Sequence, residues 1–576
     1  MIIFKDYPGF EQTSHYLENI NEYLNLLEMN SSLHYSKFIS LLLEVAELET
    51  GITDTVSIDV DRMTPLVKHC HEMTNISAEM VYETWTGKLL TIDYKKQIRN
   101  KLKKISDYYA PRLIPACIPE GFAFYGLYPE MYMEAAEHFY SERKPQKVVC
   151  VGLRTIGTVL AALVEVVLKK KGCTTWSFTV RPKGHPYNRS VEFCTEIKDH
   201  LIQLRDCWFL VIDEGPGLSG SSICGTLDKL IEIGLPAEKI VIFPSWNPDA
   251  KRFVSEKAKK IWPLFDKFLT DFTDVWITNC KLQKMFDMEI VDDFSAGRWR
   301  ETVIKDEFHF PAVYSHHERR KYLLLDNQCN SYIAKWIGLG KYGDALLTRA
   351  KILADNNFSP PVRSTSYGFA VSPFVNGRPL RSDDVNQKLF EFAADYFCFI
   401  KSNFPSKLST SYEKFNEMIH SNIFECLGNS YDTELKTIDL FPKNIYENNV
   451  VAVDGRVMPH EWLWTGERYY KVDQLEHHCD QFFPGCQNIA WDIAAFCIEF
   501  NLDQKAEHDF IDCYVQKNAD GHIYDLIPFF RIAYLAYRLG YVSSAANSLS
   551  DSMDGNRFLN EIEKYKRILV KDLISL

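Results

Sequence analysis

The sequence lacks an apolar run long enough to cross a membrane, and it lacks a basic segment followed by a long apolar core near Met1. A membrane span needs about 18 consecutive apolar residues, and a signal peptide needs the second pattern. Basic residues are also in deficit, since 65 Lys and Arg stand against 77 Asp and Glu, for a net charge of -12. We therefore expect a cytoplasmic protein, and we exclude a nucleic-acid binder that acts through a broad basic face.

Paired cysteine motifs are absent as well. The 15 cysteines are scattered, and most lie in apolar runs such as VVCVG and AAFCIEF, which is typical of buried, reduced thiols. Two runs contain metal-ligand residue types. His69 to His71 lie next to one another on a predicted helix and so point in different directions, and the consecutive residues His477 to Asp480 rarely converge on one ion. We interpret both as structural.

Internal repeats and low-complexity segments are absent, which leaves an ordinary globular chain with 46% hydrophobic and 25% charged residues. A chain of 576 residues is too long for a single core. Changes of pattern predict a helical N-terminal region over residues 1–110 and an α/β region over 111–295. A linker rich in charge and histidine follows over 296–320, and an α+β domain occupies 321–576.

Strands and helices alternate in the α/β region. KVVCVGL (147–153), TTWSFTV (174–180), CWFLVID (207–213) and KIVIFPS (239–245) are predicted strands, with amphipathic helices between them. Strands separated in this way imply right-handed crossovers and a parallel sheet. Ligands of such sheets bind beyond the carboxyl ends of the strands.

One of these strand ends is unusual. In FLVIDEGPGLSGSS (209–222), a buried strand runs into two carboxylates and a loop rich in Gly and Ser, before a helix begins. The N–H groups of such a loop and the helix N-terminus bind anions. The carboxylates would repel a phosphate, so we expect Asp213 and Glu214 to face sugar hydroxyls or Mg²⁺. The stretch therefore predicts a site for a phosphorylated ribose.

The stretch resembles the phosphoribosyl-pyrophosphate signature of type I phosphoribosyltransferases, although its loop is one residue longer and contains Pro216. The resemblance implies a phosphoribosyltransferase-like fold that uses Mg²⁺ and phosphoribosyl pyrophosphate, with Asp213 and Glu214 on the ribose and the metal. It places the 5-phosphate in the loop of Gly217, Ser219, Gly220, Ser221 and Ser222. Two other interpretations stay open: a nucleophile elbow, which lacks its final glycine here, and a tight turn capped by serine.

Two further loops fit the same resemblance. It implies that pyrophosphate binds after the first core strand, in VVCVGLRTIGT (148–158), with Arg154 stabilising the departing group. The residues expected there are Gly152, Arg154, Thr155, Gly157 and Thr158. Downstream, FTVRPKGHPYNRS (178–190) is a basic segment suited to a mobile flap, with Arg181 and Lys183 as anion ligands.

The C-terminal part resembles aminoglycoside-phosphotransferase-like kinases over residues 322–500. SYIAKW contains the expected nucleotide-facing Lys335, a helix follows, and FVNGRPL (374–380) is similar to the family's hinge. In PGCQNIAWDIAAF, Asp492 stands where the family has an aspartate at the start of a helix. The resemblance implies ATP as a ligand.

The catalytic centre of that family needs an aspartate near the acceptor hydroxyl, an asparagine five residues later, and a further metal-binding aspartate. TIDLFPKN offers Asp439 and Asn444 at this spacing, whereas PHEW offers an alternative with Trp462 in place of the base. Asp473 is the later metal ligand in both. Ala350 stands where a lysine-pairing Glu is common. An active kinase, a pseudokinase and a re-purposed binding lobe all stay open.

The leading hypothesis is a phosphoribosyltransferase-like protein that binds phosphoribosyl pyrophosphate or a related nucleotide with Mg²⁺ and transfers or releases a phosphoribosyl group. A divergent kinase-like domain is coupled to it. The alternative is a regulatory sensor that binds the same ligands without chemistry. The pairing of domains suggests bacterial stress or defence, with a small molecule as the main partner and a homo-oligomer or operon-encoded protein as a further one.

Overall fold

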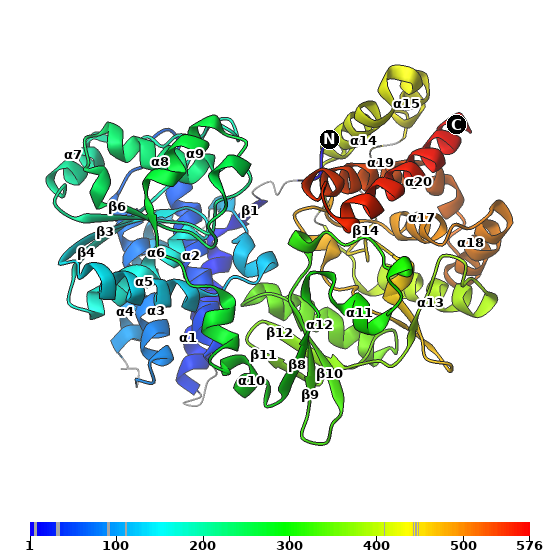
Figure 1. The fold of residues 1–576 in the computed structure, drawn as a ribbon, viewed down its shortest axis with the longest axis horizontal. Coiled ribbons are helices and arrows are strands. Elements are labelled where there is room, and N and C mark those ends of the chain that lie inside the picture. The colour runs from blue at the N-terminus through cyan, green and yellow to red at the C-terminus, as the bar shows by residue number, and fades with distance from the viewer. Residues whose placement is uncertain are drawn as a thin grey trace. The chain divides into compact units, whose positions relative to one another are not determined.

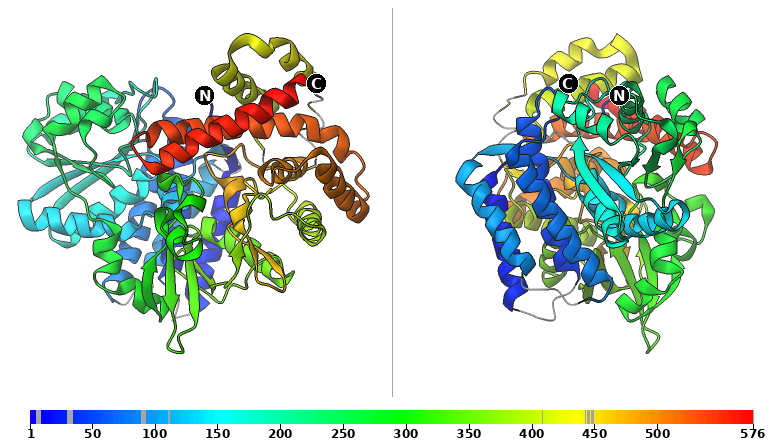
Figure 2. Two further views of the ribbon diagram at one scale, coloured as in Figure 1. Left: turned by 45° about the vertical axis from the view of Figure 1, so that its right-hand side comes forward. Right: turned by 90° about the vertical axis from the view of Figure 1, so that its left-hand side faces the viewer.

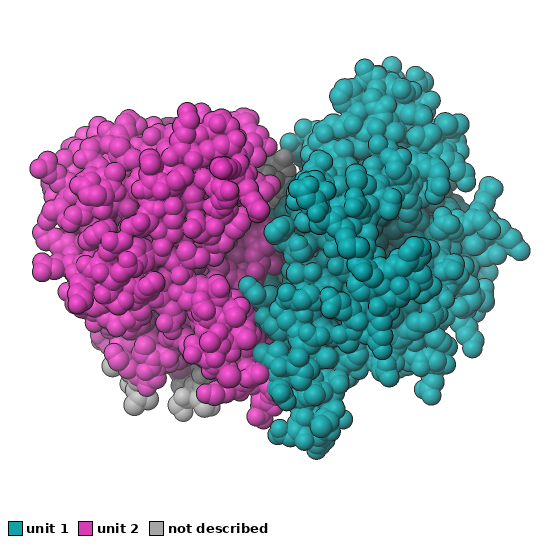
Figure 3. All heavy atoms as spheres, in the orientation of Figure 1, with its two compact units in different colours: residues 1–6, 289–337, 345–576 teal, residues 7–288, 338–344 magenta. Residues whose placement is uncertain are grey.

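The computed structural model describes residues 1–4, 9–29, 35–88, 93–109, 112–407, 409–441, 443, 446 and 449–575. The chain divides into two compact units (Figure 3). Unit 1 comprises residues 1–6, 289–337 and 345–576, and unit 2 comprises residues 7–288 and 338–344. The predicted helical region and the predicted α/β region thus belong to one unit. Residues 296–320, predicted as a linker, belong to unit 1 and form the helix α11 (Trp299–Val303) and short 3-10 turns.

Unit 2 is built on a parallel five-stranded sheet of order β4-β3-β5-β6-β7. Its strands are β3 (Lys147–Leu153), β4 (Thr174–Val180), β5 (Trp208–Ile212), β6 (Ile240–Phe243) and β7 (Asp266–Lys267). The predicted mixed α/β architecture with a parallel sheet is confirmed. In chain order the strands run 2-1-3-4-5, so the strand order reverses between β3 and β5. A reversal of this kind opens a ligand crevice beyond the strand ends.

Helices cover both faces of this sheet (Figure 1). The helices α5 (Pro129–Arg143) and α6 (Gly157–Lys170) lie on one face, and α7 (Thr195–Gln203), α8 (Ser221–Glu232) and α9 (Glu256–Ile261) lie on the other. Side chains alternate between the faces along each strand. Val149 of β3 and Val211 of β5 accordingly share a core with Ile223 and Leu227 of α8.

The N-terminal helices are an integral layer of unit 2. They are α1 (Thr13–Met29), α2 (Ser36–Val56), α3 (Pro65–Trp85) and α4 (Asp93–Tyr109). α3 begins where the Thr64 hydroxyl caps the N–H of Val67 and Pro65 occupies the first turn, as expected of a helix start. α3 packs against α2 and α6. The other elements of unit 2 include β1 (Gly9–Gln12), β2 (Leu113–Ala116) and α10 (Lys281–Phe286).

Unit 1 combines an antiparallel sheet with a helical part. The sheet has the order β11-β12-β10-β9-β8. Its strands are β8 (Glu289–Asp293), β9 (Lys321–Leu325), β10 (Ser331–Trp336), β11 (Ser364–Ser366) and β12 (Phe369–Pro373), and α12 (Lys341–Asp355) follows β10. The predicted strand, helix and strand around Lys335 are therefore confirmed.

The helical part contains two long helices that run side by side, α19 (Ile523–Ser548) and α20 (Met553–Ile574) (Figure 2). The other helices are α13 (Gln387–Asn403), α14 (Tyr412–Leu427), α15 (Asp432–Ile438), α17 (Ala490–Glu499) and α18 (Gln504–Asn518). Two small sheets connect them, formed by β13 (Arg378–Pro379), β15 (Trp462–Trp464) and β16 (Tyr469–Lys471), and by β14 (Val450–Val451) and β17 (Gln487–Asn488).

The cysteines and the apolar character of the helices agree with the composition of the sequence. All 15 cysteines are free thiols, and most are buried or half-buried. Among the described residues, none of the helices combines the length and the apolar character that a bilayer crossing requires.

Candidate functional sites

Unit 1 contains a cavity of about 270 Å³ between its antiparallel sheet and the small sheet of β15 and β16. Its apolar lining includes Ile333 and Ala370 of the antiparallel sheet, and Leu463 and Val472 in or next to the small sheet. The segment after β12 also lines the cavity, through Phe374, Val375 and Gly377. This is the segment whose sequence resembles a kinase hinge. A cavity lined by apolar side chains and a few polar groups is suited to a flat, partly polar ring.

Charged side chains line the same cavity. Lys335 of β10 contacts Asp473, and its Nζ lies 2.5 Å from Oε1 of Glu476. The Nζ of Lys321 lies 3.3 Å from Oδ2 of Asp473. Burial disfavours the charged carboxylate, but Lys321 and Lys335 hold the pKa of Asp473 well below its usual range. Glu476 thus supplies the carboxylate partner of Lys335 that the sequence of α12, with Ala350, does not.

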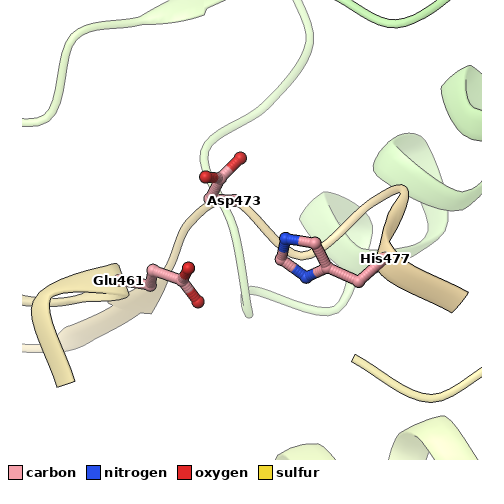
Figure 4. A group of neighbouring side chains, drawn as sticks. All are labelled: Glu461, Asp473 and His477. Atoms are coloured by element: carbon pink, nitrogen blue, oxygen red, sulfur yellow. The ribbon is translucent and has the colours of Figure 1, made fainter. Parts of the chain in front are cut away.

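Asp473 also takes part in a cluster with Glu461 and His477, whose ligand atoms all lie within 4.8 Å of one another (Figure 4). Asp473 has a left-handed backbone with φ 59°, a conformation that is costly for a residue other than Gly and is concentrated at functional sites. Nδ1 of His477 lies 3.0 Å from the carbonyl oxygen of Asp454. An N–H donated there orients the ring and leaves Nε2 free, as in metal-binding histidines. The donor set fits a divalent cation.

A buried carboxylate fixes the loop that leads to Glu461. Asp492 of α17 accepts hydrogen bonds from the N–H of Asp454 at 2.7 Å and of Gly455 at 2.9 Å. Nε1 of Trp491 donates to the carbonyl oxygen of Gly455 at 3.0 Å. Residues 454–461 are therefore braced on the first turn of α17. The prediction that Asp492 lies at the start of a helix is confirmed, and its contacts supply the reason.

The structure places the two predicted positions of the kinase base outside the cavity. Asp439 lies at the end of α15, where Asn416 and His420 donate to its Oδ1, both at 2.8 Å. It is not among the residues that line the cavity, and Asn444 lies outside the described residues. Trp462 is fully buried in the core of unit 1. The residue five positions before Glu461 is instead Arg456, which does line the cavity.

His477 is a second residue that the sequence analysis missed. The run from His477 to Asp480 was interpreted as structural because consecutive side chains rarely converge. In the structure only His477 of that run joins the cluster, and its partners come from positions 461 and 473. His477 follows Asp473 by four residues. This spacing indicates a shared site only when the fold that brings both residues next to Glu461 is known.

Unit 2 presents its acidic pair at the carboxyl end of β5, beside the reversal of strand order. Oε2 of Glu214 accepts from the N–H of Gly121 at 2.6 Å, and the Tyr132 hydroxyl donates to the carbonyl oxygen of Asp213 at 2.6 Å. Burial raises the pKa of Asp213 to about 6. Burial, together with the nearby carboxylates of Glu120 and Asp213, raises the pKa of Glu214 well above its usual range. A hydrogen-bond donor or a cation bound beside the pair would stabilise the charged form of both carboxylates.

The loop after the pair is held by the basic segment predicted as a flap. The Ser221 hydroxyl donates to the carbonyl oxygen of Pro186 at 2.5 Å, and Nη1 of Arg189 donates to Oγ of Ser222 at 3.1 Å. Oγ of Ser219 lies 3.0 Å from Oγ of Ser221. Gly220 has a left-handed backbone with φ 63° and directly precedes α8. The loop and the segment 183–190 therefore meet at the predicted phosphate position.

Two arginines predicted to bind anions, Arg154 after β3 and Arg181 in the basic segment, have other partners in the structure. The side chain of Arg154 is fully buried; its Nε donates to Asp54 at 2.9 Å, and its Nη2 contacts Asp61. Nε of Arg181 donates to the same Asp54 at 3.1 Å. Both carboxylates lie at the end of α2 or just after it. The expected role of Arg154 does not fit this position, because two acids from the N-terminal helices already neutralise the guanidinium.

The remaining predicted residues of these loops also have internal roles. Nζ of Lys183 donates to the carbonyl oxygen of Ser57 at 2.9 Å. The hydroxyls of Thr158 and Thr50 lie 3.0 Å apart, and Thr155 accepts from Nη1 of Arg181 at 3.3 Å. Gly152 and Gly157 allow β3 and α6 to approach closely, since a Cβ on Gly152 would lie 2.3 Å from the carbonyl oxygen of Gly157. Gly217 has open space around it.

Comparison with solved structures finds kinases. The choline kinase LicA from Streptococcus pneumoniae is 18% identical and aligns over 44% of this chain and 90% of its own, with a TM-score of 0.32. A choline/ethanolamine kinase family protein from Mesorhizobium loti is 14% identical over 44% and 88% of the two chains, with a TM-score of 0.32. The spectinomycin phosphotransferase APH(9)-Ia, in complex with ADP and spectinomycin, is 13% identical over 44% and 88%, with a TM-score of 0.33.

Neither the protein-family models nor the curated proteins compared with the chain gave a match. The structural similarities lie below a TM-score of 0.5.

Proposed function

We propose that unit 1 binds a nucleotide together with a divalent cation. The observation that carries this proposal is the meeting of Lys335 and Asp473 beside Glu461 and His477 in a cavity that apolar side chains also line. A lysine on a strand, a metal-binding carboxylate and an apolar slot are the parts that kinase-like sites use to hold a nucleotide.

Each of these residues has a distinct task in the proposal. Ile333, Ala370 and Leu463 cover the faces of the base, and Phe374, Val375 and Gly377 lie beside its edge. Lys335 moves from Asp473 and Glu476 to the phosphates when the nucleotide binds. Glu461, Asp473 and His477 would hold the cation, which neutralises charge on the phosphate oxygens when bound.

The test is calorimetric titration of the whole chain with ADP, in the presence of Mg²⁺ or Mn²⁺. We expect Lys335→Met to weaken binding by about tenfold or more, because the lost contact is a charge-assisted hydrogen bond to phosphate. Lys517→Met is the matched control, because Lys517 pairs with Asp395 on the surface and lies outside the cavity. Equal affinities of the two variants would contradict the proposal, as would the absence of ADP binding by the wild-type protein.

A second candidate function concerns unit 2, which we propose binds a phosphorylated ribose with Mg²⁺. Support comes from the acidic pair and the Gly- and Ser-rich loop, which follow β5 at the point where the strand order reverses. Asp213 and Glu214 would bind ribose hydroxyls or the cation, and the loop would bind the 5-phosphate. The neutralised Arg154 and Arg181 favour binding over transfer, since a departing pyrophosphate needs free cations.

Titration with phosphoribosyl pyrophosphate and Mg²⁺ tests this second candidate. We expect Asp213→Asn to weaken binding by about tenfold, while the matched control Asp228→Asn has no effect. Asp228 lies on α8 and pairs with Lys257 at the surface. An assay of pyrophosphate release with a panel of nucleobases then separates a transferase from a sensor. The idea fails if the wild-type protein does not bind the ligand.

A further inference from the structure

Arg456 lines the cavity of unit 1 at the position where a kinase would have its catalytic base. In kinases the carboxylate that accepts the proton of the acceptor hydroxyl lies five residues before the metal-binding asparagine. Glu461 occupies the metal-binding place in this cavity, since its carboxylate lies with Asp473 and His477. Counting back five residues gives Arg456, in the loop that Asp492 braces. A guanidinium thus stands where a base would be needed.

The guanidinium of Arg456 lies close to the cluster of Glu461, Asp473 and His477. Nη2 of Arg456 lies 3.8 Å from Oε1 of Glu461, and Arg456 lines the same cavity as Lys321 and Lys335. Its Nε is buried and has no hydrogen-bond partner among the described residues. A buried donor without a partner is costly, so an acceptor from a ligand would satisfy it.

An arginine cannot substitute for the missing base. The guanidinium stays protonated throughout the accessible pH range, and it offers only donors, in a planar fork that matches a phosphate. Beside Lys321 and Lys335 it adds a third cation to the wall. Three cations in the lining favour a nucleoside triphosphate, which has more negative charge than a diphosphate.

Other carboxylates that line the cavity are engaged elsewhere. Glu561 lies 3.3 Å from Nη2 of Arg538, and Asp480 accepts from the N–H of Phe482 at 2.8 Å. Glu318 accepts from the N–H of Gly297 at 2.7 Å. Glu476 pairs with Lys335 and also lies 3.5 Å from Nε of Arg319, so it keeps a partner when Lys335 turns to a nucleotide. Each of these carboxylates therefore already has a partner that stabilises its place in the wall.

We propose that Arg456 binds the terminal phosphate of a nucleoside triphosphate, so that unit 1 distinguishes triphosphate from diphosphate and retains the nucleotide without passing a phosphate to a hydroxyl. This inference rests on the proposed nucleotide binding of unit 1. Arg456 is here a specificity-determining residue.

The test compares the affinities of ATP and ADP, each with Mn²⁺, for the full chain and for Arg456→Ala. We expect Arg456→Ala to weaken ATP binding by about tenfold or more and to change ADP binding less than about twofold, since one charge-assisted contact is lost only with ATP. Arg456→Lys should fall between, because it keeps the charge without the fork. Arg468→Ala is the control, since Arg468 donates to the carbonyl oxygen of Asn357 and lies outside the cavity.

Wild-type protein is also incubated with ATP, Mn²⁺ and either choline or glycerol, and phosphorus NMR follows the nucleotide. We expect the ATP to stay intact. Formation of ADP together with a phosphorylated alcohol would overturn the inference, and so would equal losses of ATP and ADP affinity in Arg456→Ala. If the wild-type protein binds neither nucleotide, the proposed function itself fails, which is a distinguishable result.

Discussion

His71 lies at the centre of a buried hydrogen-bond network in unit 2. Its Nδ1 lies 2.8 Å from Oε1 of Glu49, and its Nε2 lies 2.6 Å from Oγ of Ser177. Ser177 also contacts Glu165. Burial alone would lower the pKa of His71, but the carboxylates of Glu49 and Glu165 raise it to about 9. A charged imidazole therefore links α2, α3 and β4, and it does not serve as a base.

This pKa predicts a pH dependence of stability. The folded-state pKa of His71 lies above the ordinary value of 6.5. The charged imidazole therefore contributes fully to the free energy of unfolding below pH 6.5, and this contribution is lost as the pH rises through about 9. Its size is on the order of 3 kcal/mol. Denaturant unfolding between pH 6 and pH 10 should show this loss in the wild-type protein and a weaker dependence in His71→Gln. His138→Gln, at an exposed position, should retain the wild-type profile.

At the scale of elements, the turn from β3 to α6 depends on two glycines. The carbonyl oxygen of Gly157 would lie 2.3 Å from a Cβ on Gly152, and that of Ile212 would lie 2.9 Å from a Cβ on Gly157. The first turn of α6 thus packs directly on the ends of β3 and β5. The two glycines therefore determine how closely the helix approaches the sheet at the candidate site.

We expect Gly152→Ala to lower the free energy of unfolding of unit 2 by about 3 kcal/mol, because neither backbone segment can move without separating helix and sheet. Gly217→Ala is the control, because open space surrounds Gly217 and its backbone has an ordinary φ. Urea denaturation followed by circular dichroism measures both variants. A loss as large in Gly217→Ala would show that the effect comes from general changes in the loops.

The short strands β15 and β16 could not be predicted from the periodicity of the sequence. The strands β3 to β6 of unit 2 are rich in β-branched and aromatic residues, and the sequence predicts all four. β15 and β16 contain three residues each, too few to show a period. These two strands position Glu461 and Asp473. The cluster of Glu461, Asp473 and His477 therefore could not be predicted from the sequence.

Over the whole molecule, the path of the chain crosses between the units. The chain begins in unit 1, where Phe4 is buried in the core and Asn422 bonds the backbone of Ile2 through its Oδ1 at 2.6 Å and its Nδ2 at 3.0 Å. It then forms most of unit 2 and returns to unit 1 at residue 289. The first residues are therefore part of the fold of unit 1, although the predicted boundaries include them in the helical N-terminal region over residues 1–110.

We expect Phe4→Ala to destabilise unit 1 by about 3 kcal/mol, the usual loss for a buried phenylalanine. Hydrogen exchange should show faster exchange in α14 and α19, with β3 and β5 of unit 2 unchanged. Phe10→Ala is the control, because Phe10 lies in unit 2 and is 68% exposed. Faster exchange in unit 2 as well would contradict the assignment of residues 1–4 to unit 1.

The sequence by itself determined the parallel sheet, the strand and helix around Lys335 and the place of the acidic pair, because these depend on local periodicity and on the turn residues next to it. Only the tertiary structure decided which charges meet. Asp54 and Asp61 neutralise Arg154 across about 100 residues of chain, and His477 joins Glu461 rather than its neighbours. Such pairings depend on distances through space, and a sequence pattern does not contain them.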